Sequence, residues 1–289
     1  MPTAASFELM AETERLSSWR FIDSGPMTGR QNMAIDLALA EHAARPAARA
    51  VLRLYSWKPP AISLGYHQSL AEIDRERCLA DQIDIVVRPT GGRAVLHADE
   101  LTYAVIIPQH DPCYDDRILT VYERISRSLL AAFRNLDVAV EFERAEKAAT
   151  DFSRGELAAL CYAGSVQYEI LHHGRKLVGS AQRRLDGVVL QHGSILLGPR
   201  HLDLPYYLSR MDDNRRAAVR SYLERRTITL NELSKRPVTY ERLAQAMRCG
   251  FSAELKAEMV AEPLTAAEQQ TAQRLLQSAG DRQSAENRQ

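Results

Sequence analysis

Long apolar runs, a net charge and a recognisable export signal are all missing from this sequence of 289 residues. No stretch of about eighteen apolar residues occurs, so we expect no membrane span. The N-terminus, MPTAASFELMAETERL, lacks the basic start and apolar run of a secretory signal. Lys and Arg total 37, as do Asp and Glu, so the basic excess typical of nucleic-acid-binding proteins is missing. These absences predict a cytoplasmic protein that binds neither membranes nor nucleic acids.

Cysteine is scarce, with four residues at positions 78, 113, 161 and 249. They lie far apart, and no CxxC or HExxH spacing occurs, so we expect no metal site. In a reducing compartment, scattered cysteines are usually small buried hydrophobes, and spacing alone marks none of the four as catalytic. Neither GxGxxG nor GxxxxGK[ST] occurs, so neither a Rossmann nor a P-loop nucleotide site is supported.

The hydrophobic content of 45% and charged content of 26% are typical of a globular protein. Helical periodicity predicts helices over 31–44 and 116–136. Strands are predicted over 51–57, 61–65, 83–88, 101–107 and 138–142, and a three-strand meander over 166–197. The turns of this meander are expected at His173-Gly174 and Asp186-Gly187. Because hairpins outnumber crossovers, we expect an α+β fold with a mixed or antiparallel sheet and packed helices.

The character of the chain changes after about residue 205, where glycine becomes rarer and helical patterns dominate. Helices are predicted over 240–247, ending at Gly250, and over 266–276. We therefore expect a catalytic domain over residues 15–212, a small helical C-terminal module over 213–278, and a frayed polar tail over 279–289.

The segment 88–97, RPTGGRAVLH, is the first candidate for a functional site. Gly91 and Gly92 allow a sharp turn that exposes backbone N–H groups, as close approach to a ligand requires. Arg88, Arg93 and His97 place polar groups around that backbone. A plain surface hairpin with solvated arginines explains the same residues and is the commoner case, so the segment alone leaves both readings open.

A second candidate lies around the strand predicted over 171–178. Alternation places Lys176 and Val178 on one face of that strand, where a lysine is usually exposed to solvent. The small residues Gly179, Ser180 and Ala181 follow directly. A run of small residues in a strand suggests that something packs closely against the backbone, as at the floor of a pocket.

Four blocks occur in the order RPTGGRAVLH, CYAGSVQYE, GRKLVGSAQ and LQHGSILL. They resemble the signature blocks of the lipoate-ligase/octanoyltransferase superfamily, and more narrowly those of LipM-type octanoyl-[acyl carrier protein]:protein octanoyltransferases. The resemblance covers about residues 19–276 and implies a catalytic domain like that of lipoate and biotin protein ligases. In the LipM-type pattern a cysteine precedes a Tyr-Glu pair by seven residues, as Cys161 precedes Tyr168-Glu169.

Two further positions bear on the subtype. ATP-dependent lipoate-protein ligases typically have a third glycine where this chain has Arg93, and they lack a cysteine at the position of Cys161. The family often has two arginines before the proline of the first block. Here Val87 precedes Arg88, so the pair is incomplete, and this weakens any function that the resemblance would assign to it.

The resemblance implies transfer of an octanoyl group from octanoyl-acyl carrier protein to a lysine of a lipoyl-domain protein, such as the glycine cleavage H protein. The transfer would pass through a thioester at Cys161 and need no cofactor and no metal. Lys176 would favour the thiolate and stabilise the negative charge that develops on the carbonyl oxygen. Eight residues would form the substrate site: Arg88, Gly91, Gly92, Arg93, His97, Gly179, Ser180 and Ala181.

Three rival functions remain open at this point. The chain could be an ATP-dependent lipoate-protein ligase, an amidotransferase that moves octanoyl or lipoyl groups between carrier proteins, or a non-catalytic module that binds such carriers. The transferase hypothesis further predicts that Cys161, Lys176 and the Gly91-Gly92 turn converge on one pocket.

Overall fold

The computed structural model describes residues 17–143, 169–209 and 211–286. Its centre is a six-stranded sheet in the order β10-β11-β6-β2-β1-β12. The pairs β10–β11, β11–β6 and β6–β2 are antiparallel, whereas β1 is parallel to both β2 and β12. In chain order these strands are β1 (Ser17–Met27), β2 (Val51–Trp57), β6 (Glu100–Pro108), β10 (Val178–Leu185), β11 (Val188–Leu196) and β12 (Ala257–Ala261). The expected mixed sheet is confirmed.

Two three-stranded sheets flank the central one. The first has the order β4 (Asp84–Val87), β3 (Ala61–Leu64), β5 (Val95–His97), and the second β7 (Glu141–Glu143), β8 (Glu169–His172), β9 (Arg175–Lys176). Both predicted turns are confirmed, with positive φ at each of their residues. The continuous strand expected over 171–178 is wrong, because β9 and β10 belong to different sheets. Buried Leu177 connects them, donating its N–H to Ile170 and accepting from Leu196.

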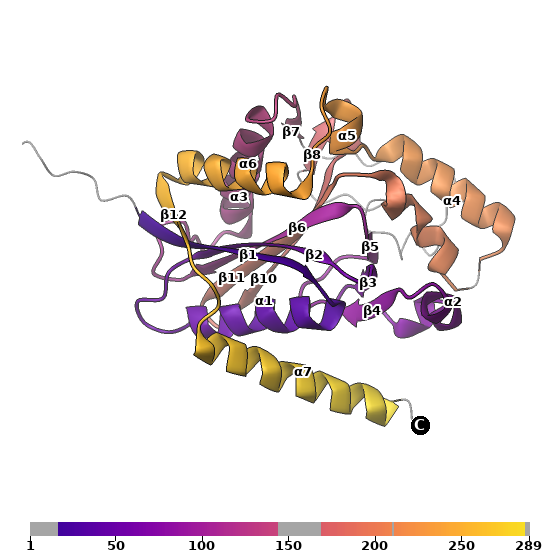
Figure 1. Ribbon diagram of the computed structural model, residues 1–289, viewed down its shortest axis with the longest axis horizontal. Helices are drawn as coiled ribbons and strands as arrows, with labels where there is room; N and C mark the ends of the chain where they lie inside the picture. Colours follow the sequence, from indigo (N-terminus) through magenta and orange to yellow (C-terminus); the bar gives the residue numbers. More distant parts are fainter. Residues whose placement is uncertain (1–16, 144–168, 210, 287–289) are drawn as a thin grey trace, which may run out of the picture.

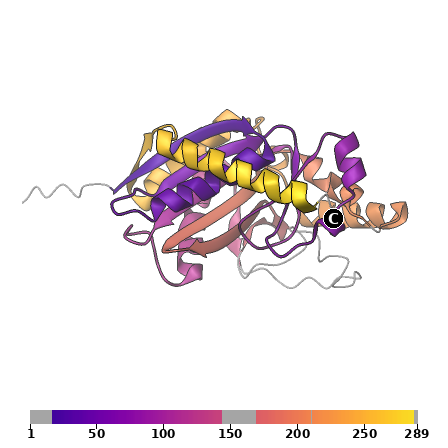
Figure 2. The same cartoon turned by 90° about the horizontal axis from the view of Figure 1, so that it is seen from below.

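Helices cover both faces of the central sheet (Figure 1). On one side, which we call the α1 face, lie α1 (Gly29–Ala43) and α7 (Ala266–Glu286); on the other, the α3 face, lie α3 (Ile118–Arg134) and α6 (Tyr240–Leu255). Seen from below, α7 runs across the outside of the molecule beside α1 (Figure 2). The helices α2 (Arg75–Ala80), α4 (Asp213–Arg226) and α5 (Leu230–Leu233), with 3₁₀ segments η2 (Leu70–Glu72) and η4 (Pro199–Tyr207), lie toward one end.

The alternation of side chains along β2 divides the core in two. Leu52 and Leu54 belong to a large cluster with α3 and α6, and Val51 and Tyr55 belong to a second cluster with α1. Successive strand residues point to opposite faces, so both faces of this strand are buried.

The C-terminal region, expected to form a small helical module over 213–278, contains a strand besides its helices. Its predicted helices are present, but β12 pairs with β1 at the edge of the central sheet. Gly250 does not end a helix either: α6 continues to Leu255, and a Cβ at Gly250 would lie 2.4 Å from the Ala132 nitrogen of α3. Glycine is needed there for close helix packing. The tail expected to fray from residue 279 is helical to Glu286.

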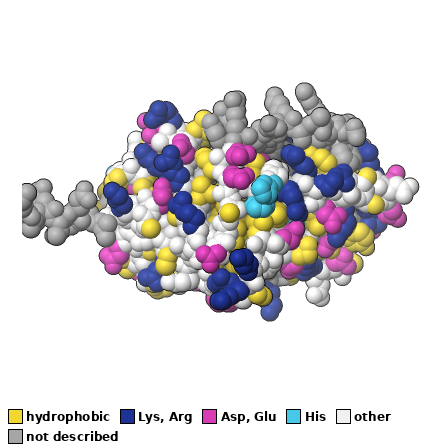
Figure 3. Space-filling view, turned by 90° about the horizontal axis from the view of Figure 1, so that it is seen from above, with side chains coloured by type: hydrophobic (Ala, Val, Ile, Leu, Met, Phe, Trp, Pro, Cys, Tyr) yellow, Lys and Arg dark blue, Asp and Glu magenta, His cyan; other side chains and the backbone are white. Residues whose placement is uncertain are grey.

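The surface above α3 and α6 carries Lys and Arg side chains interspersed with Asp and Glu (Figure 3). This mixture agrees with the formal net charge of zero. Among the described residues, no helix combines the length and the apolar character that crossing a membrane requires.

Candidate active site

A pocket with an empty volume of about 360 Å³ lies between the α1 face of the central sheet and the small sheet β4-β3-β5. Five of the predicted site residues line it: Arg88, His97, Gly179, Ser180 and Ala181. The other lining residues are Met33, Tyr55, Trp57, Ser63, Val95, Thr102, His192, Gly193 and Ser194.

The turn after β4, residues 88–93, is held in place by hydrogen bonds that arginine side chains donate to its backbone carbonyls. The Arg88 guanidinium donates to the carbonyls of Gly91 at 3.0 Å and Arg93 at 2.7 Å, and to that of Ser63 at 2.9 Å. Arg183 on β10 donates to the Pro89 carbonyl at 2.7 Å. Arg88 is therefore buried and shapes the turn, rather than being a solvated surface arginine.

The two glycines of this turn differ in their surroundings, and only Gly92 lies in close contact with the rest of the protein. Gly92 has φ of +92°, which favours glycine. A Cβ at Gly65 would lie 2.0 Å from the Gly92 carbonyl oxygen, so the turn lies directly against the end of β3. Gly91 faces open space, since no atom lies within 4 Å of where its Cβ would be.

One hydrogen-bonded chain in the pocket starts at the buried carboxylate of Glu100. His97 Nδ1 lies 2.8 Å from Glu100 Oε1, and His97 Nε2 lies 2.7 Å from Ser63 Oγ. Thr102 and Ser194 also donate to Glu100. The Trp57 ring stacks on His97 with centroids 4.1 Å apart. The imidazole is thereby fixed on its edges and on one face.

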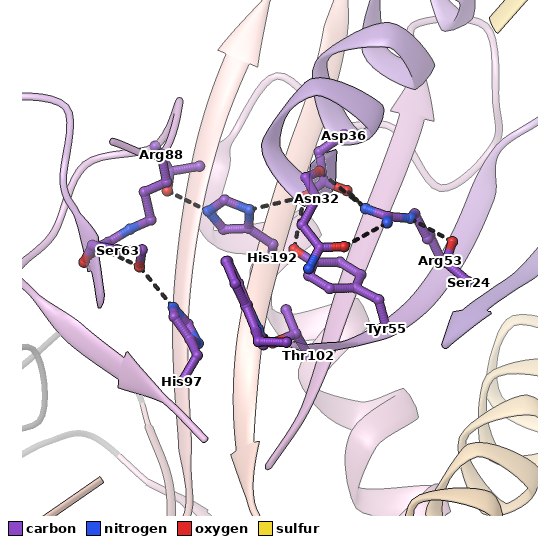
Figure 4. A network of polar contacts seen from close by, with 12 residues as sticks. Ser24, Asn32, Asp36, Arg53, Tyr55, Ser63, Arg88, His97, Thr102 and His192 are labelled. Atoms are coloured by element: carbon purple, nitrogen blue, oxygen red, sulfur yellow. Dashed lines mark hydrogen bonds and ion pairs between the residues drawn. The ribbon is translucent and has the colours of Figure 1, made fainter. Parts of the chain in front are cut away.

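A second chain starts at Asp36 on α1 (Figure 4). Asp36 is fully buried and accepts from Arg53 at 2.6 Å and from the Tyr55 hydroxyl at 2.9 Å. His192 on β11 lies between Asp36, at 3.4 Å from its Nδ1, and Thr90 Oγ1, at 2.5 Å from its Nε2. Both chains therefore have the order carboxylate, histidine, hydroxyl.

Burial and charge act in opposite directions on these carboxylates. Burial raises the pKa of Asp36, but the charge of Arg53 and the contact with His192 outweigh it, so this pKa lies below its usual value. Glu100 behaves alike: burial opposes ionisation, and His97, Ser194 and Thr102 hold its pKa below the usual range. Burial lowers the pKa of His192, which favours the neutral ring. Two ionised carboxylates, Asp36 and Glu100, thus lie behind the histidines that line the pocket.

Lys176 lies in β9 and is 3% exposed, contrary to the usual exposure of a lysine on a sheet. Its Nζ forms an ion pair with Glu169 Oε1 at 2.5 Å. Glu169 belongs to the Tyr-Glu pair that follows Cys161 in the sequence. The ion pair fixes the position of this buried side chain.

The structure brings the predicted residues only partly together. Cys161 lies outside the described residues, and Gly91, Gly92, Arg93 and Lys176 are not among the described residues that line the pocket. Their convergence with Cys161 stays a prediction. Of the remaining cysteines, burial raises the pKa of Cys78 to about 11 and of Cys113 to about 12, so neither forms a thiolate readily. In the described ranges no group of three or more His, Cys, Asp or Glu side chains could hold a metal ion.

Sequence reasoning missed the carboxylate–histidine chains. His192 and Ser194 lie in a block that the resemblance used, but they were assigned no role. A glycine within a strand often marks close approach of another group, and Gly193 is such a residue: its Cβ would lie 2.7 Å from the Tyr103 ring. Arg53 within the apolar run VLRLYSW was a second available signal, because a charged residue in a buried strand requires a partner.

Comparisons with known proteins agree on one family. Residues 28–252 match the model of the lipoyl protein ligase A/B catalytic domain. Solved structures similar in fold include a bipartite lipoate protein ligase from Thermoplasma acidophilum (TM-score 0.73, 19% identity, 90% of this chain and 92% of that one). A lipoate-protein ligase A bound with ATP is also similar (TM-score 0.70, 19% identity, 91% and 94%).

Curated relatives define the subtype. The octanoyltransferase LipM of Kyrpidia tusciae is 36% identical over 262 residues, covering 90% of this chain and 96% of the relative. That of Geobacillus kaustophilus is 38% identical over 251 residues, covering 86% and 89%. The chain belongs to the lipoyl protein ligase A/B family and, within it, to the acyltransferases of the LipM octanoyltransferase type.

Proposed function

We propose that this enzyme takes an octanoyl group from octanoyl-acyl carrier protein and attaches it to a lysine of a lipoyl-domain protein, such as the glycine cleavage H protein. The observation that carries the proposal is the similarity to LipM octanoyltransferases along almost the whole chain. The pocket supports it, because its walls combine apolar side chains with a few fixed polar groups, as is usual in sites for small apolar ligands.

The transfer passes through Cys161 in two steps. The Cys161 thiolate attacks the thioester carbonyl of the donor, and the pantetheine thiolate leaves and takes up a proton. The amine of the acceptor lysine then attacks the enzyme thioester, loses a proton and releases the Cys161 thiolate. This assignment rests on the spacing between Cys161 and Tyr168-Glu169 in the sequence.

Lys176 supplies positive charge for both steps. Its ion pair with Glu169 holds the Nζ atom at one position. A fixed cation stabilises the oxyanion that forms on the carbonyl oxygen in each step. Arg88 of the turn and the segment Gly179–Ala181 line the pocket in which the acyl group lies.

Intact mass spectrometry after mixing with octanoyl-acyl carrier protein tests the function. An octanoyl group added to wild type, and missing from Cys161→Ala, is the expected result, with Cys249→Ala as the matched control. Cys161→Ser should at most trap an ester without turnover, because its hydroxyl is hardly ionised. Full transfer by Cys161→Ala would overturn the nucleophile assignment. Pyrophosphate release from free octanoate and ATP would instead identify a ligase.

Lys176 needs a variant that separates catalysis from folding, because Lys176→Met removes the ion pair of the buried Glu169. The double variant Lys176→Met/Glu169→Gln removes both charges and should fold better than the single variant. Both should lose roughly 100- to 1000-fold in transfer rate, as expected when one charge-stabilising group is lost. Recovery of the rate in the double variant would show that Lys176 acts only on stability.

A further inference from the structure

His192 connects three segments that are distant in the sequence. It lies on β11 and lines the pocket, while its two ring nitrogens contact Asp36 of α1 and Thr90 of the turn at residues 88–93. Asp36 and His192 are 156 positions apart, and Thr90 and His192 are 102 apart. Figure 4 shows the ring in the middle of this chain of contacts.

The contacts decide which ring nitrogen carries the proton. Asp36 also accepts from Arg53 and Tyr55, and an ionised carboxylate can only accept hydrogen bonds. His192 Nδ1 must therefore carry a hydrogen and donate it to Asp36. In the neutral ring that burial favours, Nε2 is then unprotonated and accepts from the Thr90 hydroxyl.

The same hydrogen-bonded order of carboxylate, histidine and hydroxyl activates the nucleophile in serine hydrolases. Thr90, however, is 0% exposed and is not among the described residues that line the pocket. Its hydroxyl is thus unable to reach a substrate carbonyl, and the bond to His192 serves to hold the turn. The other anchors of this turn, Arg88, Arg183 and the Tyr66 N–H, bind its backbone carbonyls.

We propose that His192 is a positioning residue for acyl transfer: Asp36 sets its tautomer, and its Nε2 holds Thr90 and so aligns the turn of residues 88–93 with the floor of the pocket. The proposal rests on the proposed function in one respect, namely that this turn forms part of the acyl site. Because the carbonyl anchors remain when the hydroxyl is lost, the turn should stay attached but lose its alignment.

Thr90→Val and Thr90→Ser form a matched pair, since valine keeps the shape and serine keeps the hydroxyl. Single-turnover octanoylation by octanoyl-acyl carrier protein should be about tenfold slower in Thr90→Val, the loss of roughly one hydrogen bond. The donor concentration at half-maximal rate should not change, and Thr90→Ser should return to within about twofold of wild type. Wild-type speed in Thr90→Val, or equal slowing in Thr90→Ser, would overturn the proposal.

Two measurements on wild type and the same variants do not depend on activity. In ¹⁵N NMR spectra, His192 should show a protonated Nδ1 and an unprotonated Nε2, assigned by the signals lost in His192→Gln. Hydrogen exchange at Gly91 and Gly92 should be faster in Thr90→Val and normal in Thr90→Ser. A ring protonated at Nε2, or unchanged exchange, would overturn the role of His192. If these results hold but wild type takes up no octanoyl group, the proposed function fails and the positioning of the turn stands.

Discussion

The two faces of the central sheet are both buried, yet their chemistry differs. Under α3 and α6 the contacts are mostly apolar, with Phe133, Phe251 and Leu52 among the fully buried side chains. Under α1, the fully buried set includes the ion pair of Arg53 with Asp36. The pocket lies on this second face.

The two faces differ in how many charged side chains they bury, and therefore in the free-energy cost of burial. Burying charges is expensive unless each one is paired and hydrogen-bonded. On the α1 face, the buried and hydrogen-bonded charges hold the pocket side chains in one orientation. Apolar packing under α3 provides stability without such specific orientation. The α3 face should therefore control stability, and the α1 face both stability and catalysis.

The largest effect is expected from Arg53→Met. The substitution leaves the fully buried Asp36 without its cation, which should lower the free energy of unfolding by about 3–5 kcal/mol. Urea unfolding followed by circular dichroism measures the loss. Arg274→Met, which breaks the exposed pair with Glu41, is the matched control and should cost at most about 1 kcal/mol. Equal losses of unfolding free energy in the two variants would contradict the expectation that breaking the buried ion pair under α1 costs more than breaking an exposed one.

The second largest effect is expected from acid, which should lower the free energy of unfolding because buried histidines become protonated when the chain unfolds. Burial lowers the pKa of His201 to about 4 and lowers that of His192 as well. Between about pH 6.5 and pH 4 the unfolded chain binds protons that the folded chain does not, so the free energy of unfolding falls as the pH falls. His201 alone should account for about 3 kcal/mol over this window.

His201→Gln serves as the control for this pH dependence. The variant removes the titrating ring, so urea midpoints measured between pH 7 and pH 4 should change less than those of wild type. An unaltered slope in His201→Gln would show that this histidine is already protonated in the folded protein.

Gly250→Ala tests the apolar face. The added methyl group would meet the backbone of α3, so overpacking should cost about 1–3 kcal/mol. Octanoyl transfer per folded molecule should not change, because α6 lies on the opposite side of the sheet from the pocket. Cys249→Ala, at the exposed neighbouring position, should stay within about 0.5 kcal/mol of wild type. A transfer rate that falls with stability in Gly250→Ala would couple the two faces.

The smallest effect is expected where a buried hydroxyl is removed under α3. Among the described residues, the Ser128 hydroxyl donates to the Arg124 carbonyl of its own helix, so Ser128→Ala should change the unfolding free energy by less than about 0.5 kcal/mol. Thr102→Val removes a hydroxyl under α1 that accepts from Trp57 and donates to Glu100, and should cost about 1–3 kcal/mol. Similar values from thermal unfolding of both variants would remove the distinction between the faces.

Sequence patterns were sufficient for most local structure. The strand predicted over 51–57 coincides with β2, and both glycine-containing turns are present. Hydrophobic periodicity and turn chemistry act over a few residues, so they can be read without the fold. Strand β12 was missed because its pairing with β1 joins segments about 240 residues apart, and pairing at that distance leaves little local signal.

For the site, the sequence by itself determined the family, the candidate Cys161 and Lys176, and five residues that line the pocket. Only the tertiary structure decided what their neighbours do. Asp36 and His192 look like ordinary polar residues in the sequence, and Arg53 shows only that a partner is needed, because pairing is a property of residues brought together from α1, β2 and β11. A charged side chain joins a fixed hydrogen-bonded network only when the fold excludes water from around it. A local sequence pattern does not show which side chains will be enclosed with which partners.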